Sequence, residues 1–99
     1  MQYKTEDLQV INNPAHGRFE ITLGDETAFL SYQNRPGSII YIHAQVPPVF
    51  RHQGIAGRLT KTALDYARSK GLKVVPRCPY VANYIRLHPE YQDLVATSS

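Results

Sequence analysis

Cysteine and long apolar stretches are scarce in this sequence, and each scarcity excludes a class of protein. The single cysteine, Cys78, rules out an internal disulfide framework. No apolar run approaches the ~20 residues that a membrane-spanning helix needs. The N-terminal stretch Met1–Asp7 lacks the apolar segment of a secretory signal peptide. We therefore expect a cytoplasmic protein that does not associate with membranes.

Several ligand-binding signatures are also missing. The sequence has no Gly-x-Gly-x-x-Gly of a dinucleotide-binding fold and no Gly-Lys-Ser/Thr of a Walker loop. The histidines His16, His52 and His88 have no metal-ligand spacing with Cys78, so we expect no metal site. No repeat, low-complexity tract or linker divides the chain, and its length suits one domain over residues 1–99.

Composition indicates a folded protein with an anionic ligand. Apolar residues make up 42% of the chain, as in a globular domain. The formal net charge is +3, and the basic residues are spread along the sequence. A mild, distributed positive charge suits an anionic small molecule better than nucleic acid.

The first half of the chain predicts four β-strands, at Leu8–Asn12, Arg18–Leu23, Ala28–Gln33 and Ser38–Val46. The second and third alternate cleanly around a Gly-containing turn, which is typical of an antiparallel hairpin. In the fourth, strict alternation would place Ile40, Ile42, Ala44 and Val46 on one face and Ile39, Tyr41, His43 and Gln45 on the other. Because both faces carry bulky residues, we expect this strand to be central and covered on both faces.

The second half predicts two helices and one further strand. The first helix runs from about Gly54 to about Lys70, with Gly71 as its C-cap. The strand Leu72–Val75 follows it and is expected to pair in parallel with the strand before the helix. Pro79 suits the first position of the second helix, and a last turn is expected at Glu90–Val95. The predicted fold is therefore α/β, of the α+β type: a mixed, mostly antiparallel sheet of about five strands with two helices.

The segment Val46–Leu59 is the most informative part of the sequence. Two prolines end an apolar strand, and a short basic loop containing Gly54 leads into the first helix. A strand that passes through a glycine loop into a helix presents unpaired backbone N–H groups to one point, which attracts phosphate. Arg51 adds a fixed positive charge beside that point. The alternative is an ordinary glycine at a helix start.

This loop reads Arg51-x-x-Gly54-x-Ala56, and it resembles the pyrophosphate-binding signature of the GNAT superfamily of acyl-CoA N-acetyltransferases. The order of elements from about residue 8 to about residue 95 also resembles the core of a GNAT domain. Very small GNAT-like proteins share three features with this chain: a histidine on the fourth strand (His43), the Val46–Ala56 loop and the Cys78–Val81 segment. Two parts of a full GNAT domain are missing, namely the helices after the first strand and the final pair of strands.

The resemblance implies that acetyl-CoA or coenzyme A is bound at the helix start. The pantetheine arm would lie along the end of the fourth strand as an added pseudo-strand. The residues that the resemblance assigns to the cofactor are Val46, Arg51, His52, Gln53, Gly54, Ile55, Ala56, Gly57 and Asn83.

Three side chains are candidates for catalysis. Cys78 is expected at the N-cap of the second helix, where the helix end and Arg77 favour a thiolate. It could accept the acetyl group, or it could be a buried cysteine that only lines the cofactor channel. His43 is the candidate general base, with an ordinary histidine on a half-polar sheet face as the alternative. Tyr80 could protonate the leaving thiolate, or it could serve packing alone.

Three functions follow from this sequence. The first is an acetyl-CoA-dependent N-acetyltransferase acting on an unidentified amine, either a small molecule or a protein lysine or N-terminus. The second is a coenzyme A-binding module with little or no catalysis. The third is a small basic nucleic-acid binder, which is disfavoured because no aromatic platform with interleaved Lys or Arg is evident. The sequence does not indicate the acceptor or the oligomeric state.

Overall fold

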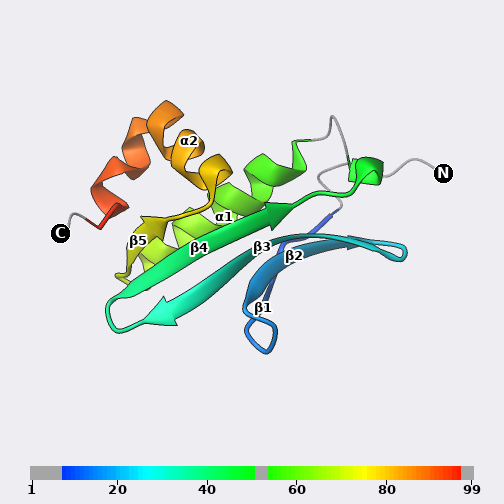
Figure 1. Cartoon of the computed structure of the whole chain (residues 1–99), viewed down its shortest axis with the longest axis horizontal. Coiled ribbons are helices and arrows are strands. Elements are labelled where there is room, and N and C mark those ends of the chain that lie inside the picture. Colours follow the sequence, from blue (N-terminus) through cyan, green and yellow to red (C-terminus); the bar gives the residue numbers. More distant parts are fainter. Residues whose placement is uncertain (1–7, 51–53, 97–99) are drawn as a thin grey trace.

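The computed structural model describes residues 8–50 and 54–96 of the chain. It consists of a five-stranded sheet, two α-helices and two short 3-10 helices (Figure 1). The elements are β1 (Ile11–Asn13), β2 (Arg18–Leu23), β3 (Glu26–Arg35), β4 (Ser38–Gln45), η2 (Pro48–Phe50), α1 (Ile55–Ser69), β5 (Lys73–Pro76), α2 (Pro79–Leu87) and η3 (Pro89–Leu94).

The strands lie in sequence order, β1-β2-β3-β4-β5. All neighbours pair antiparallel except β4 and β5, which are parallel and joined by α1. This confirms the predicted fold class. The bounds of β2 match the prediction, whereas the first strand is displaced. Leu8 was expected to begin it, but Leu8 lies in a bend and is buried in the core, and the strand begins at Ile11.

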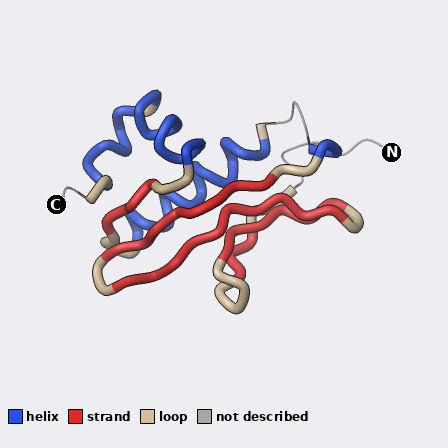
Figure 2. The backbone as a smooth tube through the Cα atoms, viewed as in Figure 1, coloured by secondary structure: helices blue, strands red, loops and turns tan. Residues whose placement is uncertain are grey.

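Both helices pack on one face of the sheet (Figure 2). Apolar residues recur every three to four positions along α1, and this stripe lies against the sheet. The fully buried side chains Ile21, Leu30, Leu59 and Leu64 share one core with Val81 of α2. The described residues therefore form two layers, with one face of the sheet bearing no helix.

A β-bulge in β4 changes which of its residues share a face. The register passes from Ser31 opposite His43 to Tyr32 opposite Tyr41, so Ile42 is an extra residue in β4. Tyr41 therefore lies on the helix-bearing face, while His43 lies on the open face. The prediction that Tyr41 and His43 share a face is wrong, because alternation read from one strand cannot show an inserted residue.

The coverage of β4 also differs from the prediction. The strand is central, between β3 and β5, as expected. Its first part is buried, including Ile39, Ile40 and Tyr41, but Ile42 is 43% exposed and His43 and Gln45 are exposed. The β5 pairing ends at Tyr41 opposite Pro76, so β4 continues beyond its neighbour. Only the first half of β4 is covered on both faces.

The chain after β5 makes backbone contacts with β4 and β5. Cys78 donates its backbone N–H to the Tyr41 carbonyl oxygen (2.8 Å) and then serves as N-cap of α2. The predicted last turn is η3, which leads into a bridge between Val95 and Val74. Ala96 donates its N–H to the Val74 carbonyl at 2.9 Å.

Candidate functional site

The start of α1 is the first part of the candidate site. Gly54 is its N-cap and has a left-handed backbone (φ 68°), which glycine adopts without strain. No side chain caps this end, and the first turn contains no acidic residue. The first intrahelical bond runs from the Arg58 N–H to the Gly54 carbonyl, so the N–H groups before Arg58 have no acceptor within the helix. This end can therefore bind an anion through its backbone.

The predicted cofactor residues in the described part of the chain differ in their exposure. Arg51, His52 and Gln53 lie outside the described residues. The Ile55 side chain is buried (2% exposed), so only its backbone can face a ligand. Ala56, Gly57 and Val46 are half-buried.

Asn83 lies on the exposed side of α2. Its side-chain oxygen accepts a hydrogen bond from Arg86 at 2.6 Å. The Asn83 side chain therefore already has a partner from its own helix.

The first turns of α1 and α2 meet at Gly57. A Cβ at Gly57 would lie 3.6 Å from the Tyr80 hydroxyl oxygen and 4.0 Å from Cε2 of Tyr84. The Tyr80 hydroxyl therefore lies beside the first turn of α1. Tyr84 lies at the same point, and burial raises its pKa, so its hydroxyl stays protonated at neutral pH.

The end of β4 runs beside these two helix starts. Past Tyr41 its backbone edge has no β5 partner among the described residues. Ile42, Val49 and Tyr80, which flank this region, are 43%, 47% and 43% exposed. Exposed large apolar side chains around a free strand edge are suited to an extended ligand with both amide and apolar groups.

The three candidate catalytic residues lie on two sides of the sheet. Cys78 is 2% exposed and belongs to the core on the helix-bearing face, and its side chain makes no cap hydrogen bond. Tyr80 follows two residues later, in the first turn of α2, and α2 lies on that same side of the sheet. His43 lies on the opposite, open face. A ligand at the β4 edge can therefore be reached from both sides.

Sequence reasoning missed the residues beside His43. The His43 ring packs edge-on against Phe29, with ring centroids 6.2 Å apart, and the Arg18 guanidinium lies 4.8 Å from the Phe29 ring centre. These residues come from the β2–β3 hairpin. Their outward positions in the alternating pattern were a usable signal, but the bulge in β4 hid which residues they would meet.

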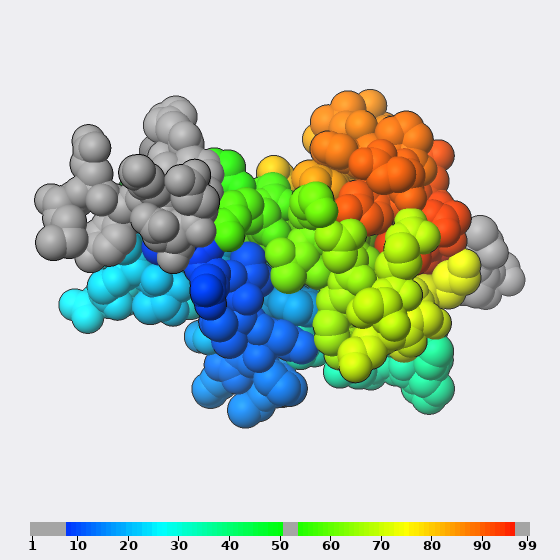
Figure 3. Space-filling view, turned by 180° about the vertical axis from the view of Figure 1, so that it is seen from behind, coloured from blue at the N-terminus to red at the C-terminus, as the bar shows by residue number. Residues whose placement is uncertain are grey.

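A cavity of about 430 Å³ lies elsewhere, between β1 and the second half of α1. Figure 3 shows this side of the molecule, where β1 (blue) and α1 (green) are neighbours. Its lining comprises Val10, Asn12, Phe19, Thr62, Asp65, Tyr66 and Ser69. None of the predicted site residues belongs to it.

The described residues contain no group of three or more His, Cys, Asp or Glu side chains able to hold a metal ion. None of their helices has the length and apolar character needed to cross a bilayer.

Comparison with known proteins adds a family match. The profile of a family described as GCN5-related N-acetyl-transferase matches residues 18–94, which contain His43, α1 and Cys78. The chicken (Gallus gallus) Protein NATD1 is 31% identical over 85 residues, which are 83% of this chain and 77% of that protein. The Protein NATD1 of Xenopus tropicalis and that of human are each 38% identical over 47 residues, covering 48% of this chain and 43% and 42% of those proteins.

Proposed function

The chain belongs to the GCN5-related N-acetyl-transferase family, and on this premise we propose that it transfers an acetyl group from acetyl-CoA to an amine. One observation carries the proposal. The free end of β4 lies next to a helix N-terminus that has neither a side-chain cap nor an acidic residue. A strand edge and an anion-binding helix end are the two features that an elongated, phosphate-bearing thioester requires.

The diphosphate would bind the backbone N–H groups of Gly54, Ile55, Ala56 and Gly57. The helix dipole places partial positive charge there, and the absence of a first-turn carboxylate avoids repulsion. Arg51, His52 and Gln53 precede these residues in the chain and complete the proposed phosphate loop.

The amide-bearing arm would lie along β4 from Ile42 to Val46, using the strand edge that β5 leaves unpaired. Main-chain hydrogen bonds give such an added strand its affinity. The exposed side chains of Ile42, Val49 and Tyr80 would then be covered, which removes apolar surface from water.

Bound acetyl-CoA would supply an acyl group activated as a thioester. The amine nitrogen would form a bond to the acyl carbon while the carbon–sulfur bond breaks, which releases the thiol. His43 would take the proton that the amine loses, since its exposed ring can act as a general base. The Tyr80 hydroxyl, at the start of α1, would donate a proton to the departing sulfur.

Cys78 would line the channel in this scheme, and transfer would be direct. Its 2% exposure favours a packing role over a nucleophilic one. An intact mass measured after a rapid acid quench with acetyl-CoA tests this. An acetyl adduct that disappears in Cys78→Ser, together with lost turnover, would instead establish a covalent route.

Calorimetric titration with coenzyme A tests the proposal as a whole. We expect saturable heat with the native chain, and acetylation of at least one amine in a panel. His43→Gln should bind coenzyme A normally and lower the rate constant at least about tenfold, with the loss persisting from about pH 6 to about pH 9. Absence of binding heat would refute the proposal.

A second candidate function is a coenzyme A-binding module without turnover. The connection between β1 and β2 favours it, because a short turn at residues 14–17 stands where the resemblance predicts acceptor-binding helices in larger relatives. Binding heat without acetylation of any amine would select this function.

A further inference from the structure

The cavity between β1 and the second half of α1 has no part in the proposed acetyl transfer. α1 packs across β2, β3, β4 and β5, and its contacts with β1 are fewer, so the helix leaves the edge of the sheet partly uncovered. The space left there has a volume of about 430 Å³. Small-molecule sites have volumes of roughly 300–1,000 Å³. The cavity is therefore large enough for a small organic ligand.

Two aromatic rings form the apolar part of this cavity. Phe19 is 2% exposed on the helix-bearing face of β2, and the Tyr66 ring of α1 meets it edge-on, with ring centroids 5.4 Å apart. Val10 adds an aliphatic side chain from the segment before β1. Aromatic rings favour a further ring in an offset-stacked or edge-on position. These three residues therefore suit an aromatic ligand.

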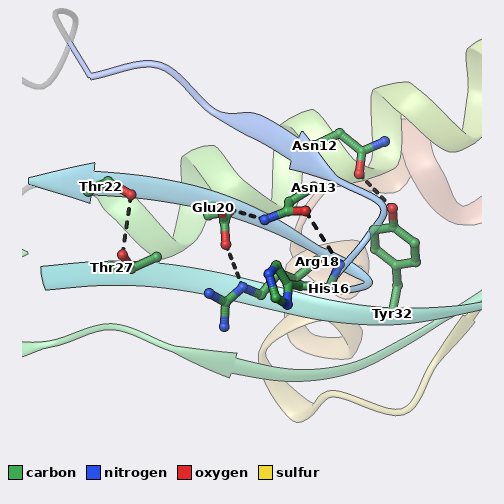
Figure 4. A network of polar contacts seen from close by, with 8 residues as sticks. All are labelled: Asn12, Asn13, His16, Arg18, Glu20, Thr22, Thr27 and Tyr32. Carbon is green, nitrogen blue, oxygen red and sulfur yellow. Dashed lines mark hydrogen bonds and ion pairs between the residues drawn. The ribbon is translucent and has the colours of Figure 1, made fainter.

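A hydrogen-bond donor of fixed orientation lies beside these rings. Asn12 pairs with Phe19 across β1 and β2, so both side chains lie on the same face of the sheet. The Tyr32 hydroxyl donates a hydrogen bond to the Asn12 side-chain oxygen at 2.6 Å, and the Asn12 nitrogen points away from Tyr32 (Figure 4). Among residues 8–50 and 54–96, no group accepts a hydrogen bond from this nitrogen. The nitrogen can therefore donate to a ligand.

A hydrogen-bond acceptor lies on the α1 side of the cavity. The Asp65 carboxylate belongs to the lining, and its two oxygens accept hydrogen bonds from Lys61 and from the Tyr91 hydroxyl, at 2.9 and 2.7 Å. Burial would raise the pKa of Asp65, but these bonds lower it, so the carboxylate is ionised at neutral pH. Each oxygen has two lone pairs, so Asp65 can accept one more bond from a ligand while Lys61 balances its charge.

These groups together limit the chemistry of the ligand. A purely aliphatic ligand would displace water from Asn12 and Asp65 without replacing its hydrogen bonds, which costs free energy. A cation would meet Lys61 and also Lys70, whose ammonium lies 5.9 Å from the Tyr66 ring centre, whereas an anion would meet Asp65. An aminated purine is neutral and flat, and it has ring nitrogens that accept hydrogen bonds and an exocyclic amine that donates them.

We propose that this cavity binds a neutral purine nucleoside that carries an exocyclic amine. The base packs against Phe19 and Tyr66, its amine donates to Asp65, and a ring nitrogen accepts from Asn12. The sugar hydroxyls reach the hydroxyl groups that Thr62 and Ser69 add to the lining. This site lies along the second half of α1, away from the helix start, and the proposal does not depend on acetyl transfer.

The test is a titration of the full chain with adenosine, followed through the backbone amide signals in NMR spectra. We expect saturable shifts at Asn12, Asp65 and Tyr66, with a Kd of about 1 mM or below. Purine riboside lacks the exocyclic amine and should bind at least about fivefold more weakly. No saturable shift at the lining residues, or equal affinity for the two nucleosides, would overturn the proposal.

The variant Asn12→Asp separates the ligand contact from the fold. The aspartate keeps an oxygen for the Tyr32 hydroxyl but loses the N–H donor, so adenosine affinity should fall at least about tenfold. Asn34→Asp makes the same replacement at an exposed position of β3 and should change the affinity less than about twofold. Denaturant unfolding checks that both variants fold. Unchanged affinity in Asn12→Asp would overturn the proposal.

A second variant keeps the test decisive should Asn12→Asp not fold. Ser69 is exposed at the rim of the cavity, and Ser69→Trp should fill the space and abolish the adenosine shifts at Asn12. Normal binding of adenosine in Ser69→Trp would place the nucleoside elsewhere and overturn the proposal.

Coenzyme A also contains an adenine, so it distinguishes the cavity from the proposed phosphate site. The affinity for adenosine should be the same with and without saturating coenzyme A. Competition between the two would place adenosine at the start of α1 and overturn the proposal. Failure of coenzyme A to bind would refute the proposed acetyl transfer, and the nucleoside titration with its variants would still decide whether the cavity is a site.

Discussion

The two ends of α1 differ in how their polar groups are satisfied. At its C-terminal end, Gly71 and Leu72 donate their N–H groups to the carbonyls of Arg68 and Ala67, at 3.2 and 2.9 Å. This is the Schellman arrangement, and it uses carbonyls that would otherwise lack partners. At the N-terminal end, Gly54 provides no side-chain cap and no acidic residue follows it. One end is closed by the chain itself, whereas the other end has no side-chain cap and is the proposed phosphate site.

Side chains extend this contrast. Arg68 donates hydrogen bonds to both carboxylate oxygens of Asp93, at 3.0 and 2.9 Å, and to the Glu90 carbonyl at 2.7 Å. Asp65 accepts bonds from Lys61 and from the Tyr91 hydroxyl, at 2.9 and 2.7 Å. The contacts of Arg68 and of Tyr91 join η3 to α1, whereas the Lys61–Asp65 pair lies within α1. The comparison shows that the side-chain contacts that stabilise α1 lie toward its C-terminal end. The proposed binding site for coenzyme A lies at its N-terminal end.

The sharpest way to break this comparison is a matched pair of glycine substitutions. Gly54 and Gly71 both have φ of 68°, and a Cβ at either would meet none of the described atoms within 4 Å. Gly54→Ala and Gly71→Ala should each cost about 1 kcal/mol of folding free energy, because alanine is strained in this conformation. Only Gly54→Ala should weaken coenzyme A binding, by about tenfold or more. Denaturant unfolding and calorimetry measure the two effects.

Equal losses of affinity in the two variants would show that strain anywhere in α1 disturbs binding. The N-terminal end would then have no special role. Normal affinity in Gly54→Ala would move the phosphate site away from the start of the helix.

A second substitution, at the N-terminal end of α1, should raise the stability of the fold and weaken coenzyme A binding. Ala56→Glu puts a carboxylate into the first turn of α1, where the helix dipole favours it by about 0.3–1 kcal/mol. The same charge should repel the phosphates and weaken coenzyme A binding by about tenfold. Ala56→Gln is the uncharged control and should lose much less affinity. A more stable variant with unchanged affinity would contradict the proposed site.

Local patterns predicted most of the fold. The alternation in Arg18–Leu23 gave β2 its observed bounds, and the spacing of apolar residues placed α1 within one residue at each end. Pro79 marked the start of α2. Each of these signals comes from chemistry within one element, where sequence neighbours decide the conformation.

The errors arose where distant residues decide the outcome. The bulge at Ile42 depends on how β4 pairs with β3, and no pattern within β4 reveals it. It moved His43 to the face opposite Tyr41 and beside Phe29. The Val74–Val95 bridge likewise depends on how η3 folds back. The sequence therefore predicted which residues could act in the site but not which of them face each other.

The C-terminal end can be weakened without touching the proposed site. Tyr91 is 5% exposed, and its hydroxyl donates to Asp65 at 2.7 Å. Tyr91→Phe should lower the free energy of unfolding by about 1 kcal/mol, the usual net contribution of one hydrogen bond. Coenzyme A affinity should change less than about twofold. A large loss of affinity in this variant would mean that the two ends of α1 are coupled.

The smallest expected effect concerns pH at the same end. Burial would raise the pKa of Asp65, but hydrogen bonds from Lys61 and Tyr91 outweigh it and lower the pKa. A carboxyl group with a lowered pKa in the folded state contributes stability above its unfolded pKa of about 3.9, and this contribution is lost as pH falls through the folded value. Asp65→Asn should therefore be less stable than the native chain at about pH 7, by less than about 1 kcal/mol because the ion pair is partly exposed.

The two unfolding curves should converge below about pH 3, where the native carboxyl is protonated as well. Denaturant midpoints at several pH values measure this convergence. A difference in unfolding free energy that stays constant from about pH 7 to about pH 2 would show that the ionised carboxylate contributes nothing.

Tyr91 provides a second check at alkaline pH. Burial and the bond to Asp65 raise the pKa of Tyr91, so the stability that its hydroxyl contributes is present below about pH 10 and is lost as pH rises through the folded value. Because the first turn of α1 has no carboxyl group, this acid-sensitive stability belongs to the closed end of the helix alone.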